Sequence, residues 1–184
     1  MAGRRRDLGA GIFHVYTHCV WAAPALFRDD TDRIAFLREL ARATARVEWT
    51  CMAYCLMRTH YHLILGVEEG VLSLGMHAVN FRYACAFNQR HDMRGHVQAA
   101  RYGSRRIEND DELMFIFRYV ARNPVEAGLC GDPADWPWSS YAATIGKAEP
   151  IAFVDPSRII NCFGDTPEEA VAALRDYVER SPDS

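Results

Sequence analysis

The segment that decides the fold is Trp49-Thr-Cys-Met-Ala-Tyr-Cys-Leu-Met-Arg-Thr-His-Tyr-His-Leu-Ile-Leu-Gly-Val67. Its aromatic, aliphatic and β-branched residues predict two strands, 49–57 and 60–67, joined at Arg58-Thr59. An even-length connection pairs positions whose numbers sum to 117, which sets Cys55 opposite His62. Because side chains alternate along a strand, one face should be apolar and meet the helices, and the other should carry both histidines. The apolar face comprises Met52, Tyr54, Leu56, Tyr61, Leu63 and Leu65, and the histidine face comprises Cys51, Ala53, Cys55, Met57, His60 and His62.

The His-x-His pair formed by His60 and His62 indicates a metal site. Alternation sends both imidazoles to the same face, and a third ligand from a neighbouring helix would complete a three-point cradle. The amide oxygen of Asn123 is the predicted third ligand. Imidazole and amide ligands with solvent-open positions accommodate Mg²⁺ or Mn²⁺ that also holds a phosphate oxygen.

Tyr119 is the predicted catalytic nucleophile. A helix that is capped by Asn109-Asp-Asp-Glu112 and limited by Pro124 carries Tyr119 four residues before Asn123. Residues at this spacing lie about 5 to 6 Å apart on one helix face, so the phenol oxygen could attack a phosphorus atom held by the metal. The expected product is a covalent phosphotyrosine, which keeps the phosphodiester energy for a later strand to recapture.

The other elements complete an expected α+β fold of the ferredoxin-like type. A first strand over 11–21, a helix from the Asp29-Asp-Thr-Asp32 cap to about 47, a helix over 72–91 and a short basic strand ending at 107 give the order β-α-β-β-α-β. We expect an antiparallel sheet with helices on one face, plus an extra helix that carries the tyrosine. Residues 1–150 would form this domain, with Trp136-Pro-Trp-Ser-Ser-Tyr141 packed onto it as a lid, and 151–184 an acidic helical tail.

The composition indicates a globular protein of the cytoplasm. The chain has 184 residues, 49% of them hydrophobic, and a net charge of −3. No apolar run approaches the roughly 18 to 20 residues that a membrane span needs, and no signal-peptide core follows the basic start. The six cysteines form no CxxC pair, which favours reduced thiols in a reducing compartment. We therefore expect no membrane partner.

Positive charge gathers in the middle of the chain. Residues 82–122 carry 8 Arg or Lys against 5 acids, whereas 126–184 carry 4 against 11. Arginine suits phosphate because its planar guanidinium can donate two parallel hydrogen bonds, although a solvated helix face is the usual reason for such a run. The candidate DNA-backbone contacts are Arg82, Arg90, Arg101, Arg105, Arg106 and Arg122, with stacking help from Tyr102.

Seven stretches resemble the single-tyrosine HUH transposases, and especially the REP-associated tyrosine transposases. They run in the family's order over about residues 12 to 145: Phe13-His-Val-Tyr, Leu26-Phe-Arg-Asp-Asp-Thr-Asp-Arg, Ala53-Tyr-Cys-Leu-Met-Arg-Thr-His-Tyr-His-Leu, Gly95-His, Arg101-Tyr, Arg118-Tyr-Val-Ala-Arg-Asn-Pro-Val-Glu-Ala-Gly-Leu and Trp136-Pro-Trp-Ser-Ser-Tyr. The chain departs from the family at Arg58-Thr59, where Pro-Asn is usual, at Ala100-Arg-Tyr-Gly-Ser104, where Gly-Arg-Tyr-Lys-Ser is usual, and at His18-Cys-Val20, where an Arg-Gly turn is usual.

The resemblance implies a DNA strand-transfer enzyme. Such a nuclease domain binds single-stranded or hairpin DNA, requires a divalent metal, cuts through a 5′-phosphotyrosine and leaves a free 3′-OH, as DNA transposition and recombination require. His60 and His62 match the HUH metal ligands and Tyr119 the nucleophile, and Asn123 matches the position that supplies a third ligand. Relatives can also exchange the tyrosine helix between subunits, so a homodimer is possible.

Two other interpretations stay open at this stage. The first is a domesticated module that holds a DNA or RNA hairpin without cutting it. The second is a structural zinc site formed by Cys51, Cys55, His60 and His62, although Cys-x3-Cys on a strand differs from the tight knuckles that bind zinc well. The remaining histidines are expected to be ordinary surface or interior residues: His14, His18, His77, His91 and His96.

Overall fold

The sheet at the centre of the molecule has four antiparallel strands in the order β2-β3-β1-β4. The computed structural model describes residues 9–18, 25–93 and 102–180. Its strands are β1 (Gly11–His18), β2 (Thr50–Leu56), β3 (His60–Val67) and β4 (Gly103–Ile107). Its helices are α1 (Asp30–Arg46), α2 (Val71–His91), α3 (Asp110–Glu126), α4 (Tyr141–Thr144), α5 (Ser157–Ile160) and α6 (Pro167–Glu179), with a 3₁₀ turn, η1, at Pro133–Asp135. The expected α+β fold is confirmed.

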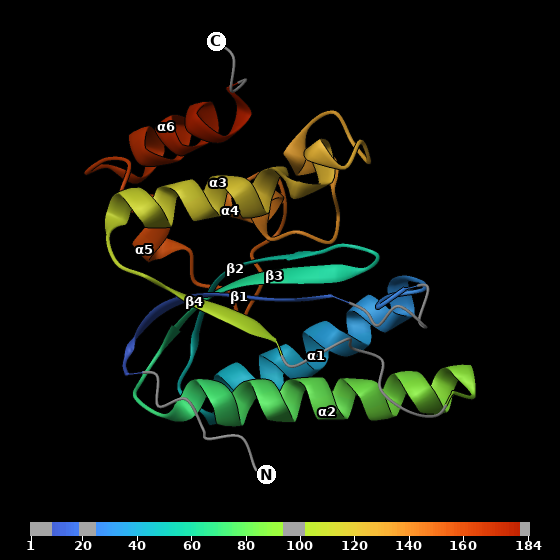
Figure 1. Cartoon of the computed structure of the whole chain (residues 1–184). Helices are drawn as coiled ribbons and strands as arrows, with labels where there is room; N and C mark the ends of the chain where they lie inside the picture. The colour runs from blue at the N-terminus through green and yellow to red at the C-terminus, as the bar shows by residue number, and fades with distance from the viewer. Residues whose placement is uncertain (1–8, 19–24, 94–101, 181–184) are drawn as a thin grey trace.

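Helices cover both faces of the sheet, not one. In Figure 1, α1 and α2 lie below the sheet, and α3 to α6 lie above it. Each face has its own apolar core: Phe36 and Tyr83 belong to the α1/α2 side, and Ile116 and Leu174 to the α3/α6 side. The expectation of one covered face plus one extra helix was incomplete, because the turn-rich residues after α3 contribute a second layer. In a sheet covered on both faces, the side chains of both faces are packed against a core and are held rigidly.

The β2–β3 register agrees with the prediction at its turn end and departs from it further along. Cys55 lies opposite His62 as expected, but the pairing shifts between Cys51 and Ala53. A β-bulge inserts one extra residue, and a shift of one residue reverses the face of every side chain beyond it. Cys51 therefore packs in the α1/α2 core and Met52 in the α3/α6 core. The predicted faces of these two residues were wrong.

The predicted helix caps are confirmed. The side chain of Asp29 accepts a hydrogen bond from the backbone N–H of Asp32, and that of Asn109 accepts one from Glu112. Pro124, however, does not end α3, which continues to Glu126. Proline removes a single helical N–H donor.

The segment 136–155 closes the outer edge of β2. Ser140 donates its backbone N–H to the Tyr54 carbonyl, and Leu56 donates to the Trp138 carbonyl. The indole N–H of Trp136 donates to the Leu56 carbonyl. An unpaired sheet edge invites association with other strands, and this segment removes that risk. The packing of the tryptophan segment onto the body, predicted from the sequence, is thus confirmed.

The last helix, α6, packs along α3. Its Leu174 and Val178 side chains are fully buried in the core on that side. The division of the chain at residue 150 into a domain and a tail stays a prediction. Within the described ranges, no helix is both long enough and apolar enough to cross a lipid bilayer.

Candidate active site

The side chains of His60, His62 and Asn123 meet at one point between β3 and α3. Nε2 of His60 lies 3.0 Å from Oδ1 of Asn123. Nε2 of His62 lies 3.5 Å from Nδ2 of the same amide. The His60 and His62 rings have their centroids 5.1 Å apart. The two imidazoles and the amide that the sequence singled out are therefore brought together by the fold.

Each histidine is held by its other ring nitrogen. Nδ1 of His60 lies 3.1 Å from the Thr59 hydroxyl. Nδ1 of His62 lies 3.0 Å from Nε2 of His14, a buried contact between β3 and β1. Metal-binding histidines commonly have this arrangement, in which a partner at one nitrogen orients the other toward the ion. His14, expected to be an ordinary surface or interior residue, is buried in the interior, where it contacts His62.

His14 is a neutral partner for His62. It is 7% exposed, and burial, assisted by the charge of Arg105, lowers the pKa of His14 to about 4. At neutral pH its ring therefore carries one proton, which leaves one ring nitrogen as an acceptor. If that acceptor is Nε2, His62 donates from Nδ1, and its Nε2, which lies 3.5 Å from Nδ2 of Asn123, is the unprotonated nitrogen.

Tyr119 stands beside the histidines of its own chain. Its ring centroid is 5.2 Å from that of His62 and 6.1 Å from that of His14, edge-on in both cases. The residue is 45% exposed, so its phenol is open to solvent. Because α3 carries Tyr119 one turn before Asn123, the predicted nucleophile and the predicted third ligand reach the same place. No second subunit is needed to bring this tyrosine to the histidines.

Two of the candidate DNA contacts lie on α2, which is on the opposite side of the sheet from α3 (Figure 1). A guanidinium nitrogen of Arg82 is 3.9 Å from Glu39 of α1. Arg90 forms ion pairs of 2.6 Å with both Asp29 and Asp32, and Asp32 is fully buried. Arg90 thus ties the end of α2 to the start of α1.

The other candidate contacts differ in their surroundings. Arg105 forms an ion pair with Glu112 of α3, and its side chain remains 67% exposed beside the histidine face. Arg106 packs against Gly11 and lies 3.7 Å from Glu108. Arg122 donates to the Val178 carbonyl and pairs with Glu126, so its guanidinium is already engaged within the protein. Tyr102 is partly buried against the α1/α2 core. Arg101 lies outside the described residues. Among the described candidates, Arg105 combines an exposed side chain with a position opposite His14 on the neighbouring strand.

The structural zinc interpretation does not fit the described residues. The bulge turns Cys51 to the opposite face from His62, and burial raises the pKa of both Cys51 and Cys55. Zinc binds thiolates, and a raised pKa opposes their formation. Over residues 9–18, 25–93 and 102–180, no three His, Cys, Asp or Glu side chains are grouped so that they could hold a metal ion.

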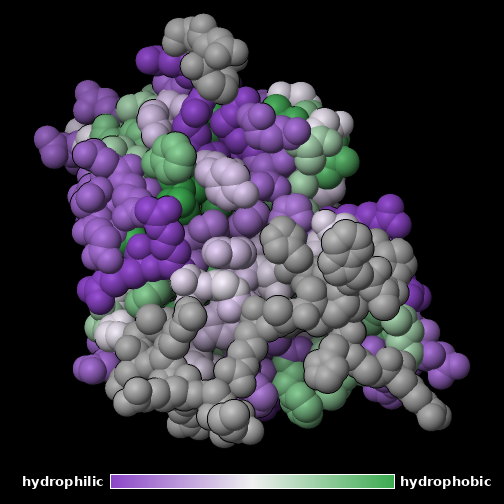
Figure 2. All heavy atoms as spheres, viewed as in Figure 1, coloured by the Kyte–Doolittle hydropathy of each residue, from purple (hydrophilic) through white to green (hydrophobic). Residues whose placement is uncertain are grey.

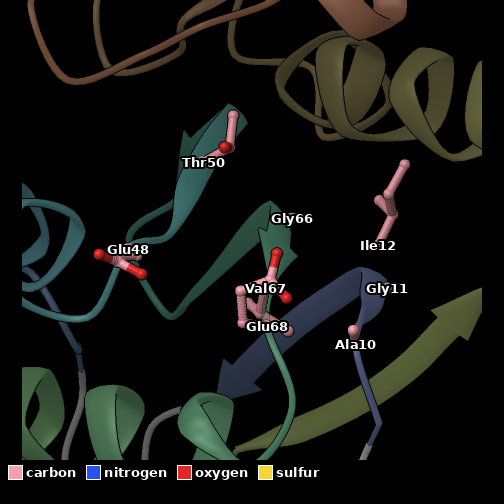
Figure 3. Close-up of a pocket in the computed structure, with 8 residues that line it drawn as sticks. All are labelled: Ala10, Gly11, Ile12, Glu48, Thr50, Gly66, Val67 and Glu68. Atoms are coloured by element: carbon pink, nitrogen blue, oxygen red, sulfur yellow. The ribbon is translucent and has the colours of Figure 1, made fainter.

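Figure 3 shows a pocket at the other end of the sheet, where β1 begins and β3 ends. Its volume is about 250 Å³, and Glu48 and Glu68 line it. Two carboxylates would repel a phosphate, so this pocket is not part of the candidate site.

The face seen in Figure 2 is largely hydrophilic over α3 and α6, with a few apolar side chains among the polar ones.

Comparisons with known proteins identify the fold. Neither a protein-family model nor a curated protein sequence matches the chain. A solved structure does: a REP-associated tyrosine transposase bound to a REP hairpin, with a TM-score of 0.66 and 17% sequence identity, over 80% of this chain and 86% of that one. The chain has the fold of a REP-associated tyrosine transposase. The resemblance seen in the sequence is thereby confirmed at the level of the fold.

Two further solved structures are more distant. A proposed transposase of Deinococcus radiodurans R1 gives a TM-score of 0.44 at 15% identity, over 65% of this chain and 95% of that one. The tRNA(His) guanylyltransferase of Saccharomyces cerevisiae gives 0.48 at 10% identity, over 96% and 81%. Neither value is high enough to support a conclusion about this transposase-like chain.

The donor atoms on this transposase fold suit a hard divalent cation. Two imidazole nitrogens converge on a side-chain amide, and each imidazole has a fixed partner at its second nitrogen. An amide oxygen is a hard ligand of the kind that Mg²⁺ and Mn²⁺ accept. The set His60, His62 and Asn123 therefore fits the predicted metal, and Mg²⁺ or Mn²⁺ there remains a proposal.

Sequence reasoning missed two residues of the site, His14 and Tyr16. Both lie on β1, whose alternation places Phe13 and Val15 in the α1/α2 core. The register of β1 against β3 sets Tyr16 opposite His62. Period-2 alternation in residues 11–18 was the available signal. The alternation alone could not predict that these side chains lie near His62, because that depends on the β1–β3 register, which pairs segments far apart in the chain.

Proposed function

We propose that this protein cleaves and rejoins single-stranded or hairpin DNA through a covalent 5′-phosphotyrosine on Tyr119, with a divalent metal at His60, His62 and Asn123. One observation carries the proposal: the exposed Tyr119 ring lies beside His62, whose Nε2 atom converges with that of His60 on the Asn123 amide. The transposase fold supports it.

The chemistry at Tyr119 is a phosphoryl transfer in which bonds balance. The phenol oxygen forms a bond to phosphorus as the bond from phosphorus to the 3′ oxygen breaks. The phenol loses its proton to the solvent to which it is open, and the departing 3′ oxygen takes one up. A later 3′-OH reverses the step and releases Tyr119. The number of phosphodiester bonds is conserved, so no external energy source is required.

The residues around Tyr119 would position the substrate phosphate and stabilise its negative charge. A bound Mg²⁺ or Mn²⁺ would supply Lewis-acid polarisation of a phosphate oxygen. His60 and His62 fix the position of that phosphate relative to Tyr119, because both belong to one rigid strand of a sheet buried on both faces. Arg105 adds positive charge on the same side. Placing reactive groups in this way can account for much of a rate enhancement.

The test uses end-labelled hairpins with single-stranded flanks, incubated with the full chain and Mg²⁺ or Mn²⁺. A denaturation-resistant protein–DNA adduct and a DNA fragment with an extendable 3′-OH are expected. Tyr119→Phe should give neither and should still bind the hairpin. Tyr177→Phe, which removes a phenol on α6 away from the histidines, is the matched control and should form the adduct. If neither metal yields an adduct while hairpin binding persists, the chain is a binding module.

A further inference from the structure

The ring of Tyr16 lies directly on the backbone of Gly103, its partner across β1 and β4. A Cβ atom added to Gly103 would come within 2.5 Å of Cζ and 2.6 Å of Cε2 of Tyr16. Real Cβ atoms do not approach other atoms so closely, so only glycine permits this ring position. The ring is therefore held in one place by main-chain atoms, yet the residue remains 36% exposed.

Tyr16 also borders the candidate active site. Its ring centroid lies 5.2 Å from that of His14 and 6.3 Å from that of His62. Tyr119 contacts the same two imidazoles. The two tyrosines thus flank one histidine pair, Tyr119 from α3 and Tyr16 from β1.

Arg105 provides a positive charge on the strand that pairs with β1 beside Tyr16. It is two residues from Gly103 on β4, opposite His14, and its exposed guanidinium is tied to Glu112. Proteins hold unpaired nucleotides with an exposed aromatic ring, on which the base stacks, and a cation on the same surface, which the phosphate faces. A ring that is already fixed loses little freedom when a base stacks on it.

We propose that Tyr16 is a stacking platform for the unpaired nucleobase next to the phosphate that Tyr119 attacks, and that Gly103 exists to seat its ring. This rests on the proposed function, since it assumes a phosphate at His60 and His62. It gives β1 a role in substrate binding, and it makes an unpaired base at the cut site, not the hairpin stem alone, a determinant of binding.

Other exposed aromatic residues lack these neighbours. Phe115 is 62% exposed on α3, one turn before Tyr119, but in the described residues its ring makes no contact with an imidazole. Phe81 is 61% exposed on α2, across the sheet, where it stacks with His77. Phe81 therefore serves as the matched control for removing an exposed aromatic ring.

The test measures stacking separately from cleavage. The protein carries Tyr119→Phe so that DNA stays intact, and 2-aminopurine, whose fluorescence falls when it stacks, occupies one flank position at a time in the labelled hairpin. One or two adjacent positions should show quenching that Tyr16→Ala abolishes. The same variant should weaken binding by about 5- to 100-fold, the usual effect of losing one stacked base. Tyr16→Phe and Tyr16→Trp should keep the quenching, and so should Phe81→Ala.

Gly103→Ala provides the second measurement. It should reduce quenching when Tyr16 is present and have no further effect in the Tyr16→Ala protein, because its only consequence for DNA is to displace that ring. Thermal denaturation of each variant shows that it is folded. Quenching that is unchanged in Tyr16→Ala, or a loss equally large in Phe81→Ala, would overturn the platform.

The two proposals fail in different ways. If the protein with Tyr119 intact forms the adduct but quenching does not depend on Tyr16, the platform is wrong and the cleavage proposal stands. If quenching depends on Tyr16 but no adduct forms with either metal, the platform belongs to a binding module and the cleavage proposal is wrong. If no single-stranded or hairpin DNA binds at all, both are wrong.

Discussion

Nε2 of His14 lies 3.0 Å from Nδ1 of His62, and both side chains are almost fully buried. This contact joins β1 to β3 behind the candidate metal ligands. It makes His14 a positioning residue, because it fixes which way the His62 ring faces without being directed at the Asn123 amide itself.

His14→Ala should therefore weaken metal binding by about 10- to 100-fold, the usual effect of removing a partner that orients a metal-bound histidine. The adduct yield of the variant, titrated with Mn²⁺, should shift to higher metal concentration and recover at saturation. His77→Ala, an exposed histidine on α2, is the control. A half-maximal Mn²⁺ concentration that His14→Ala leaves unchanged would contradict the role.

Asn123 should behave as a ligand and not only as a hydrogen-bond partner of His60. Asn123→Ala removes an oxygen donor and should raise the Mn²⁺ concentration needed for half-maximal adduct formation. Asn123→Asp keeps an oxygen at the same place and adds a charge, so it should bind the metal at least as well as the parent protein. Isothermal titration with Mn²⁺ alone measures both directly. Equal affinities in all three proteins would remove Asn123 from the ligand set.

DNA binding should depend on Arg105 and not on Arg82. Each lost phosphate contact lowers the slope of log affinity against log salt concentration by about 1. Arg105→Ala should show this reduced slope, whereas Arg82→Ala, on the far side of the sheet, should not. Glu112→Gln, which removes the ion-pair partner of Arg105, should strengthen binding at low salt. Identical slopes for the two arginine variants would argue that the DNA lies elsewhere.

Gly75 should be an exception to the rule that replacing glycine with alanine stabilises a helix. Alanine normally stabilises the interior of a helix relative to glycine by about 1 kcal/mol. A Cβ at Gly75 would lie 2.2 Å from Cζ2 and 2.4 Å from Cη2 of the buried Trp49. Gly75→Ala should therefore destabilise the protein, by about 1 to 3 kcal/mol, as overpacked cores usually do. Urea denaturation checks the sign, Ser73→Ala on the same helix is the control, and Trp49→Phe should relieve the loss.

The sequence alone gave the strands of the hairpin, the helix caps and the spacing of Tyr119 and Asn123. These follow from local rules: alternation along a strand, capping by Asp29 and Asn109, and four-residue neighbours on a helix. Even the pairing of Cys55 with His62 depends only on the length of a two-residue connection. Each of these features involves residues only a few positions apart in the sequence, so it can be predicted without knowing the tertiary structure.

The tertiary structure decided which residues surround those local features. It set His14 behind His62, seated Tyr16 on Gly103, turned Cys51 to the other core and engaged Arg90 with Asp32. Each of these contacts depends on a β-bulge or on pairing between segments distant in the chain. These contacts are stabilised by the packing of two apolar cores against one sheet. The periodicity of a single segment does not determine which residues of a distant segment will lie opposite it.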